Sequence, residues 1–214
     1  MRSTHKPTRP STIMARLVSL CIASTVSVAG CQSESRRAAD LQRDAAAQPQ
    51  QEFIAQLRTL CGKAYQGRLV EDSTGSPDFA GKAFIMHVRL CESDRILVPF
   101  HVGEDRSRTW IFTPTEGRIL LKHDHRHKDG SEDEITMYGG WTQAAGTPER
   151  QEFYADAHTS SLIPAASTNV WTVELVPGDR FIYSLRREGT SRRFRVEFDL
   201  TEPVPAPPPP WGWE

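Results

Sequence analysis

The feature that most restricts the fold of this chain is a two-residue period in its C-terminal half. In the segment RFRVEFDL, charged residues alternate with four apolar ones: Phe194, Val196, Phe198 and Leu200. Successive side chains of a β-strand point to opposite faces, so this alternation predicts a strand with one buried face and one wetted face. Similar short runs recur from residue 84 onward, separated by turn segments such as GEDRSR, KDGS, VPGD and REGT.

These runs predict an all-β domain. We expect roughly eight or nine strands within roughly 140 residues, with no helix between them. Because sequential hairpins leave no long crossover, a single antiparallel β-barrel of the lipocalin kind is favoured over a sandwich. One short helix precedes the strands, since QEFIAQLRTL carries apolar residues at helical spacing and is followed by Gly62.

The N-terminal segment is typical of a secretory signal. Residues 1–30 contain Arg2, Lys6, Arg9 and Arg16, then the uncharged run LVSLCIASTVSVA, which is too short to span a bilayer permanently. Because MARLVSL also begins a compact signal, translation starts at Met1 or at Met14.

The end of this segment, Val28-Ala29-Gly30-Cys31, resembles the lipobox of bacterial lipoproteins. The resemblance implies cleavage before Cys31 and acylation of Cys31 by chains such as palmitate. Since Gln32 follows the cysteine, it also implies export to the outer membrane, with the domain anchored by lipid and facing the periplasm or the cell surface. The alternative is ordinary secretion with Cys31 unmodified.

Composition divides the mature chain into three parts. Residues 31–50 are polar and rich in Ala and Gln, which is typical of a flexible, lipidated tether that is helical in part. Residues 51–202 form the antiparallel β domain. Residues 203–214 form a Pro-rich tail with polyproline II character. We expect Trp211 and Trp213 in this tail to cover an apolar patch of the barrel; the alternative is that they dock another envelope protein.

Charge and cysteine content restrict partners and compartment. Residues 1–30 hold four of the 26 Lys and Arg residues and no Asp or Glu, so the mature chain has 22 basic and 27 acidic residues and a net charge of −5. An acidic domain without a basic patch is not expected to bind nucleic acid. Cys61 and Cys91 form an even pair for an oxidising compartment, which predicts a disulfide worth about 3–4 kcal/mol.

The segment LLKHDHRHKDGSEDEITMYGG places three histidines at alternate positions before Asp129-Gly130. An Asp-Gly pair is typical of a two-residue type I′ hairpin turn, so Lys128 should pair with Ser131. The same register pairs the histidines with residues of the next strand: His127 with Glu132, His125 with Glu134 and His123 with Thr136.

This register brings imidazoles and carboxylates to one face. Alternate strand residues are about 7 Å apart and cross-strand neighbours about 5 Å apart, which suits a metal ion. The candidate ligands for zinc or copper are His123, His125, His127 and Glu134. The preferred alternative is a polar hairpin at the barrel rim, since His–Glu pairs also occur in water.

Two other sequence features give weaker indications of a functional site. GSPDFAGKA resembles a phosphate-binding loop, but five residues separate its glycines and Ala83 stands where a Ser or Thr would bind magnesium. No residue is assigned a catalytic role. A set of arginines surrounds the final turn, and its alternation with acidic residues favours a solvated outer face with internal ion pairs. The alternative is a set of inward-pointing arginines that hold the carboxylate of an anionic lipid, as in barrels that bind such lipids. The set comprises Arg186, Arg187, Arg192, Arg193 and Arg195.

The globular part resembles a group of secreted bacterial lipoproteins of unknown activity. The resemblance rests on FHVGEDRSRTW and KHDHRHKDGSEDEITMYGG, covers residues 52–201, and implies only a location in the cell envelope. We therefore expect a non-catalytic, lipid-anchored barrel that binds a small apolar ligand or supports an envelope assembly. The alternative is a metal-binding protein, or a metal-dependent hydrolase, built on the histidine hairpin.

Overall fold

A computed structural model of the chain describes residues 28–213. The expected signal sequence, except for residues 28–30, and both candidate start residues lie outside this range. The chain divides into two units, Met1–Ala38 and Ala39–Glu214, and the second contains every strand found within residues 28–213. Within residues 28–213, none of the helices combines the length and the apolar character that a membrane span requires.

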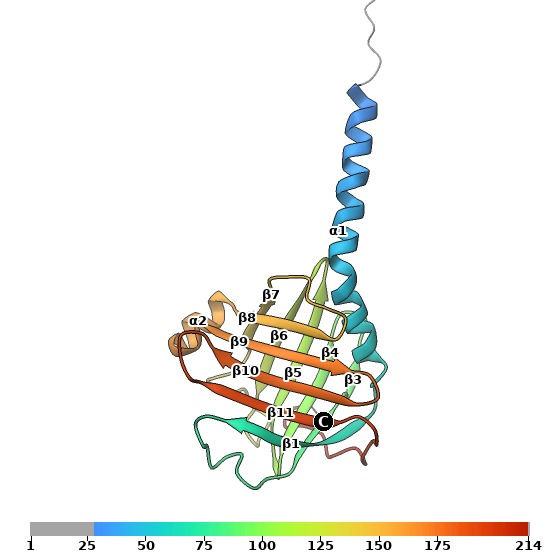
Figure 1. Ribbon diagram of the computed structural model, residues 1–214. Coiled ribbons are helices and arrows are strands. Elements are labelled where there is room, and N and C mark those ends of the chain that lie inside the picture. The colour runs from blue at the N-terminus through green and yellow to red at the C-terminus, as the bar shows by residue number, and fades with distance from the viewer. Residues whose placement is uncertain (1–27, 214) are drawn as a thin grey trace, which may run out of the picture. The chain divides into compact units, whose positions relative to one another are not determined.

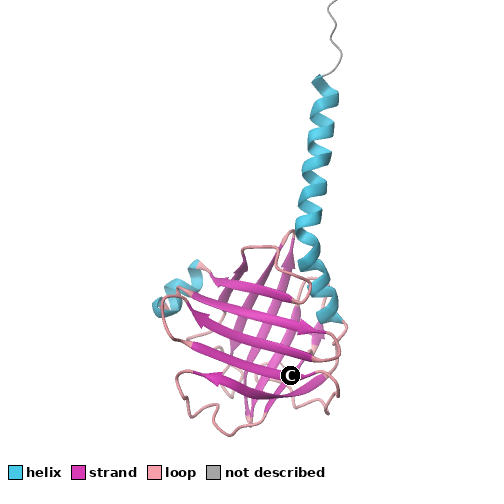
Figure 2. Cartoon of the chain, viewed as in Figure 1, coloured by secondary structure: helices cyan, strands magenta, loops and turns pink. Residues whose placement is uncertain are grey.

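Residues of the second unit form a closed antiparallel β-barrel, which confirms the predicted fold class (Figures 1 and 2). The sheet has the strand order β2-β1-β11-β10-β9-β8-β7-β6-β5-β4-β3, and an additional pairing of β2 with β4 closes it. Ten strands make the closed ring, and β3 pairs with the first residues of β4 on the edge that β2 also uses. The strands are β1 (Ala64–Asp72), β2 (Phe84–His87), β3 (Leu90–Cys91), β4 (Ile96–Val102), β5 (Asp105–Thr115), β6 (Arg118–His125), β7 (Tyr138–Thr142), β8 (Arg150–Ala155), β9 (Asn169–Val176), β10 (Arg180–Arg187) and β11 (Arg193–Asp199).

The alternation of apolar and charged residues in the sequence corresponds to the inner and outer faces of the barrel. In β11, Phe194, Val196 and Phe198 are buried while the charged residues between them are half-buried. In β10, Phe181 and Tyr183 are buried on the same inner face. Burying such rings contributes about 1.5–3 kcal/mol each, and the inner faces of all strands share one hydrophobic core.

The helix before the barrel is longer than predicted. Helix α1 spans Val28–Arg58 and contains all of the predicted tether, residues 31–50. The Ala, Gln and Arg residues that suggested a solvated linker are also good helix formers, so the helix extends N-terminally from its packed end. Phe53 and Leu57 belong to the barrel core, as the spacing of QEFIAQLRTL predicted.

The last turns of α1 cover one end of the barrel. The side-chain amide of Gln50 donates hydrogen bonds to Thr142 Oγ1 (3.1 Å), at the end of β7, and to the carbonyl of Ala144 (3.0 Å). The backbone of Ile119, next to the β5–β6 turn, donates to the same Thr142 hydroxyl (3.0 Å). This end of the barrel is therefore filled by the helix and by the apolar side chains beneath it.

Two short helices lie between β8 and β9, where the sequence predicted no helix: α2 (Ala157–Leu162) and the 3₁₀ turn η1 (Pro164–Ala166). Asp156 caps α2, because its carboxylate accepts a hydrogen bond from the backbone N–H of Thr159 (2.9 Å). The Thr159 hydroxyl also bonds to Gly139 at the start of β7. These helices lie at the end of the barrel opposite α1 (Figure 1).

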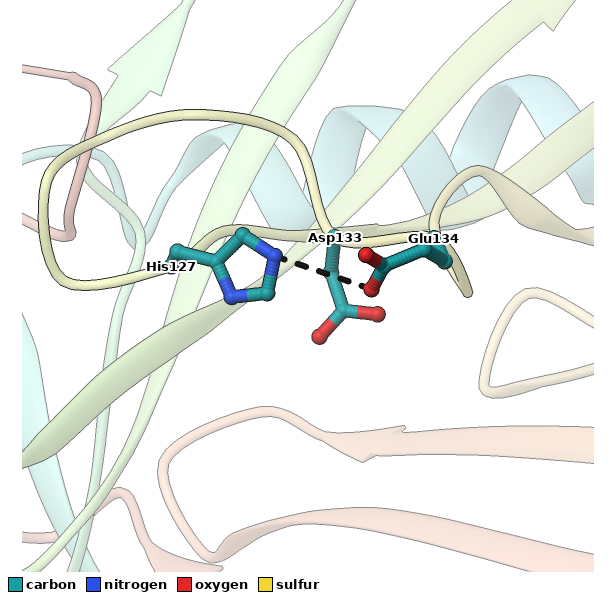
Figure 3. A group of neighbouring side chains, drawn as sticks. All are labelled: His127, Asp133 and Glu134. Atoms are coloured by element: carbon teal, nitrogen blue, oxygen red, sulfur yellow. Dashed lines mark ion pairs between the residues drawn. The ribbon is translucent and has the colours of Figure 1, made fainter.

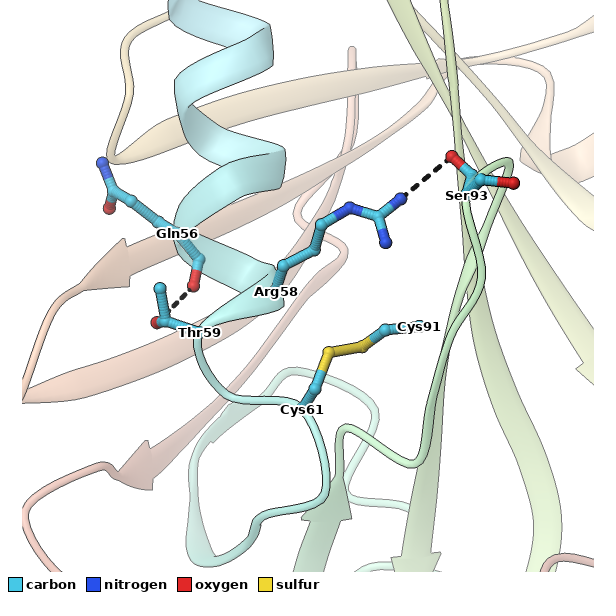
Figure 4. Close-up of a disulfide and its surroundings, with 6 residues drawn as sticks. All are labelled: Gln56, Arg58, Thr59, Cys61, Cys91 and Ser93. Atoms are coloured by element: carbon cyan, nitrogen blue, oxygen red, sulfur yellow. Dashed lines mark hydrogen bonds between the residues drawn. A yellow bond between two sulfur atoms is a disulfide. The ribbon is translucent and has the colours of Figure 1, made fainter.

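The predicted disulfide is confirmed. Cys61 and Cys91 are joined with a Cα–Cα distance of 6.3 Å, and the bond links the loop after α1 to β3 (Figure 4). Arg58 Nη2, in the last turn of α1, donates a hydrogen bond to the carbonyl of Ser93 (3.1 Å), just after β3. Together these contacts fix the end of α1 to the edge of the barrel.

Removal of the disulfide should destabilise the barrel without changing its fold. The bridge closes a loop of 30 residues, so the Cys61→Ser/Cys91→Ser variant should lose about 3–4 kcal/mol of unfolding free energy in guanidinium titrations. Wild-type protein unfolded under reducing conditions is the matched control and should show the same loss. A loss below about 1 kcal/mol would contradict the loop-closure argument.

Candidate ligand-binding site

A cavity of about 420 Å³ lies at the barrel end opposite α1. The first residues of β5, β7, β9 and β11 and the last residues of β6 and β10 contribute to it, together with η1 and the loops before β2 and β7. Its volume falls in the range of small-molecule sites. Aromatic rings form much of its apolar wall, and they are those of Phe79, Phe100, Trp110, Tyr138, Trp171, Tyr183 and Phe194.

The rings stack on one another because they occupy inward positions of neighbouring strands. Trp110 stacks on Tyr183 with centroids 4.4 Å apart and on Phe100 with centroids 4.8 Å apart. Such contacts add about 0.5–1.5 kcal/mol per pair beyond burial. Each ring limits the rotamers of its neighbours, so the wall is preorganised rather than collapsed.

His123 belongs to this wall, and its ring is fully paired. Its Nδ1 lies 3.1 Å from the Tyr138 carbonyl, which only accepts, so Nδ1 carries the proton; Nε2 then accepts from the Tyr183 hydroxyl at 2.6 Å. Its ring also stacks on that of Tyr138 at 4.6 Å. Burial lowers the pKa of His123 to about 3, so the imidazole is neutral at physiological pH.

His125 forms a second tyrosine–histidine pair. Its Nε2 lies 3.1 Å from the Tyr138 hydroxyl. Burial, followed by the nearby charge of Arg108, lowers the pKa of His125 to about 4. Burial raises the pKa of Tyr138 to about 12. Both pairs are therefore uncharged, and the deep part of the cavity is polar in places but carries no net charge.

Three arginines supply the charge at the cavity, and two of them are ion-paired. Arg192 donates to Asp72 Oδ1 at 2.8 Å. Burial raises the pKa of Asp72, but hydrogen bonds from Thr74, Ser76 and Arg192 outweigh this and lower it to about 2. Arg108 pairs with Asp105, and its guanidinium lies 5.6 Å from the ring centroid of Phe79.

The third arginine, Arg187, has an amide as its partner. Its Nε donates to Asn169 Oδ1 at 2.9 Å, directly across the β9–β10 pairing. No carboxylate of residues 28–213 forms an ion pair with it. Arg187 and Arg192 were expected on a solvated outer face, and that prediction is wrong for both. It holds for Arg186 and Arg195, which pair with Glu152 and Glu197 on the outside. Nothing in the described contacts of Arg193 assigns it to the cavity.

The register predicted for the histidine hairpin is wrong. The backbone N–H of Gly130 bonds to the carbonyl of His127 (2.9 Å), and the N–H of His127 bonds to the carbonyl of Ser131 (2.9 Å). The turn therefore contains three residues, with Gly130 at φ 87°, rather than the two-residue turn typical of Asp-Gly.

The residue pairing between the two arms of the hairpin shifts again beyond this turn. Arg126 pairs with Glu132, whereas His123 pairs with Tyr138 instead of Thr136. The loop before β7 absorbs the difference, and Met137 takes a positive φ of 56° within it. The predicted His–Glu cross-strand pairs are consequently not formed.

As a result, the four predicted metal ligands do not converge. His123 and His125 line the cavity, whereas His127 lies outside it. His127 and Glu134 remain together, with an Nε2–Oε2 distance of 3.7 Å, and Asp133 joins them (Figure 3). One ligand atom from each of these three residues lies within 4.8 Å of the other two. The side chains of His127 and Glu134 are 47% and 88% exposed, so water solvates this group.

The Pro-rich tail packs behind the histidines, on the outer face of β6. Trp213 Nε1 donates to Asp124 Oδ2 at 2.7 Å, and Asp124 also accepts from Arg126 Nε. The backbone of Trp211 bonds to the carbonyl of Arg106 (3.1 Å). The tail therefore docks through hydrogen bonds to a buried carboxylate and to a backbone carbonyl. The side chain of Asp124 is 1% exposed, and its burial by the tail had no sequence signal.

Comparison with protein-family models, with curated proteins and with solved structures found no match to this chain. The assignment of a site therefore rests on its geometry.

The buried histidine should make stability depend on pH. In the folded chain the pKa of His123 is about 3, against about 6.5 in an unfolded chain. Between these values only the unfolded state binds the proton, so stability is retained above pH 6.5 and lost as the pH falls. Replacing His123 by Gln should reduce the loss between pH 7 and pH 5, measured by urea unfolding, by about 2 kcal/mol. His158→Gln, at an exposed site, is the control. An unchanged slope in His123→Gln would contradict the assignment.

Proposed function

We propose that this protein is a non-catalytic, lipid-anchored barrel of the bacterial cell envelope that binds a small ligand in its aromatic cavity. The observation that carries the proposal is a preformed cavity of about 420 Å³ at one end of a barrel whose other end is filled. Sites of this size with a few converging polar groups commonly hold small molecules.

The chemistry of the wall supports binding rather than catalysis. Both cavity histidines are engaged by tyrosines, and both have pKa values far below neutrality. A general base works best when its pKa lies near the operating pH. Burial keeps Tyr138 and Tyr183 protonated, because it raises the pKa of each. The wall thus offers apolar surface, and its two histidines and two tyrosines are not poised to accept or release a proton.

The envelope location rests on the N-terminal residues. Lipidation of Cys31, within Val28-Ala29-Gly30-Cys31, would attach the protein to a membrane through acyl chains. The disulfide between Cys61 and Cys91 supports an oxidising compartment such as the periplasm. We place the protein at the outer membrane, with the barrel facing the periplasm.

A neutral apolar fluorophore tests the cavity. N-phenyl-1-naphthylamine should bind with increased emission and should quench cavity tryptophans Trp110 and Trp171. Leu185→Trp places a larger ring in the cavity and should weaken binding at least tenfold, about 1.4 kcal/mol. Val70→Trp, at an exposed outer position, is the matched control and should bind as wild type does. If the wild-type protein binds no probe, the cavity is not a ligand site and a role in envelope assembly is favoured.

A second candidate function is metal binding at His127, Asp133 and Glu134. It is favoured by one observation, the convergence of three ligand atoms within 4.8 Å. Zinc accepts this combination of nitrogen and oxygen ligands, with water completing the tetrahedron. We rank it second because no buried partner fixes the exposed side chains.

Calorimetric titration with Zn²⁺ and Cu²⁺ tests this candidate. If the cluster binds metal, His127→Ala should weaken binding at least tenfold, whereas His158→Ala, which removes an exposed histidine elsewhere, should leave it unchanged. Equal binding by both variants would eliminate the cluster as a site.

A further inference from the structure

We propose that the ligand of the cavity is an amphipathic anion, such as a carboxylate with an apolar body, whose head group is held by Arg187. This inference rests on the proposed ligand-binding function and specifies the chemistry of the ligand. The observation behind it is that the three arginines of the cavity have different partners: two are paired with carboxylates and one with an amide.

The first step is the charge balance at the cavity. Arg108 and Arg192 each have a carboxylate partner that does not line the cavity, Asp105 and Asp72 respectively. Within residues 28–213, the side chain of Arg187 is paired with the amide oxygen of Asn169 alone, which satisfies its Nε but does not compensate its charge. Among residues 28–213, its two terminal nitrogens donate no hydrogen bond. These nitrogens form the donor edge that binds a carboxylate in two parallel hydrogen bonds.

The second step is the position of Arg187. It follows Tyr183 and Leu185 at alternate positions of β10, and all three line the cavity. The guanidinium is therefore at the outer end of a stripe that becomes apolar with depth. The backbone N–H of Arg187 donates a hydrogen bond to the carbonyl of Arg192 (3.2 Å). The two residues are therefore neighbours, and the guanidinium of Arg192 also lines the cavity. Because Asp72 fixes Arg192, that second charge is held at the cavity rather than free to turn into solvent.

The third step is that the polar groups deeper in the cavity already have hydrogen-bond partners. His123 is satisfied by Tyr183 and by the Tyr138 carbonyl, and the Tyr138 hydroxyl is paired with His125. A ligand segment placed against them need not supply further hydrogen bonds. Aromatic faces of Trp110 and Trp171 then favour a hydrocarbon or aromatic body. The cavity thus matches an anionic head at the rim and an apolar body inside.

The same arrangement disfavours other classes of ligand. A neutral ligand of the same shape would displace water from Arg187 without supplying a negative charge in its place. The guanidinium would then be desolvated at a free-energy cost. A cationic ligand would approach the uncompensated guanidinium of Arg187. The one acidic side chain in the lining, Asp133, already accepts a hydrogen bond from the backbone of Ile135 (2.8 Å) and lies on the loop before β7.

A series of ligands with one chain length and different heads tests the inference. Dodecanoate, dodecanol and dodecyltrimethylammonium are titrated against bound N-phenyl-1-naphthylamine at pH 7.5, below their critical micelle concentrations. We expect dodecanoate to bind at least tenfold more tightly than dodecanol, and the cation to bind most weakly. In Arg187→Met the advantage of dodecanoate should fall below threefold, while the affinity for dodecanol stays within threefold of wild type. Arg187→Lys, which retains the charge, should retain part of the advantage.

Arg180→Met is the matched control, because Arg180 lies on the same strand, at the far end, and pairs with Asp179 away from the cavity. It should keep the full preference for dodecanoate. Equal binding of dodecanoate and dodecanol to wild type, or an unchanged preference in Arg187→Met, would overturn the inference while leaving the ligand-binding function intact. If none of the three ligands displaces the probe and Leu185→Trp has no effect on probe binding, the proposed function itself fails.

Discussion

The pairing of β2 with β4 is the interaction on which the rest of the structure depends. Three residue pairs, Phe84–Val102, Ile85–His101 and Met86–Phe100, convert an open sheet into a closed barrel. Closure removes the exposed edges and gives every strand an inner face. The cavity, the aromatic stacks and the inward position of the histidines all follow from that inner face. The disulfide lies beside this seam, since Cys91 belongs to β3, which pairs with β4. It thereby stabilises the region whose opening would expose the whole core.

The two ends of the barrel differ in how they are sealed, and this difference produces the candidate site. At one end, Phe53 and Leu57 of α1 enter the core, so side chains fill the interior. At the other end, α2 and η1 are too short to do the same, and only Ile163 and Ala166 near η1 reach the cavity lining. The space left there is bounded by stacked rings whose positions are set by their strands. The barrel is therefore filled by α1 at one end and holds a preorganised cavity at the other.

Much of the barrel could be predicted from the sequence because a two-residue period translates directly into an inner face and an outer face. The same rule, continued along β10 from Phe181 through Tyr183 and Leu185, would also have placed Arg187 inside. The hairpin register could not be predicted in this way. Asp-Gly favours a two-residue turn, but the structure uses a three-residue turn, and a one-residue slip moves every side chain to a new partner. The partners that stabilise this choice, such as Trp213 on Asp124, come from distant parts of the sequence.

The alternating histidines consequently have a structural explanation that differs from metal binding. On the inner face of β6, His123 and His125 pair with tyrosines and form part of the cavity wall. On its outer face, Asp124 is buried beneath Trp213 of the C-terminal tail. Strand β6 therefore separates the cavity from the tail, and its polar side chains on each face are covered and hydrogen-bonded. A strand with buried polar groups on both sides resembles a solvated hairpin in sequence. Only the closed barrel and the docked tail distinguish the two.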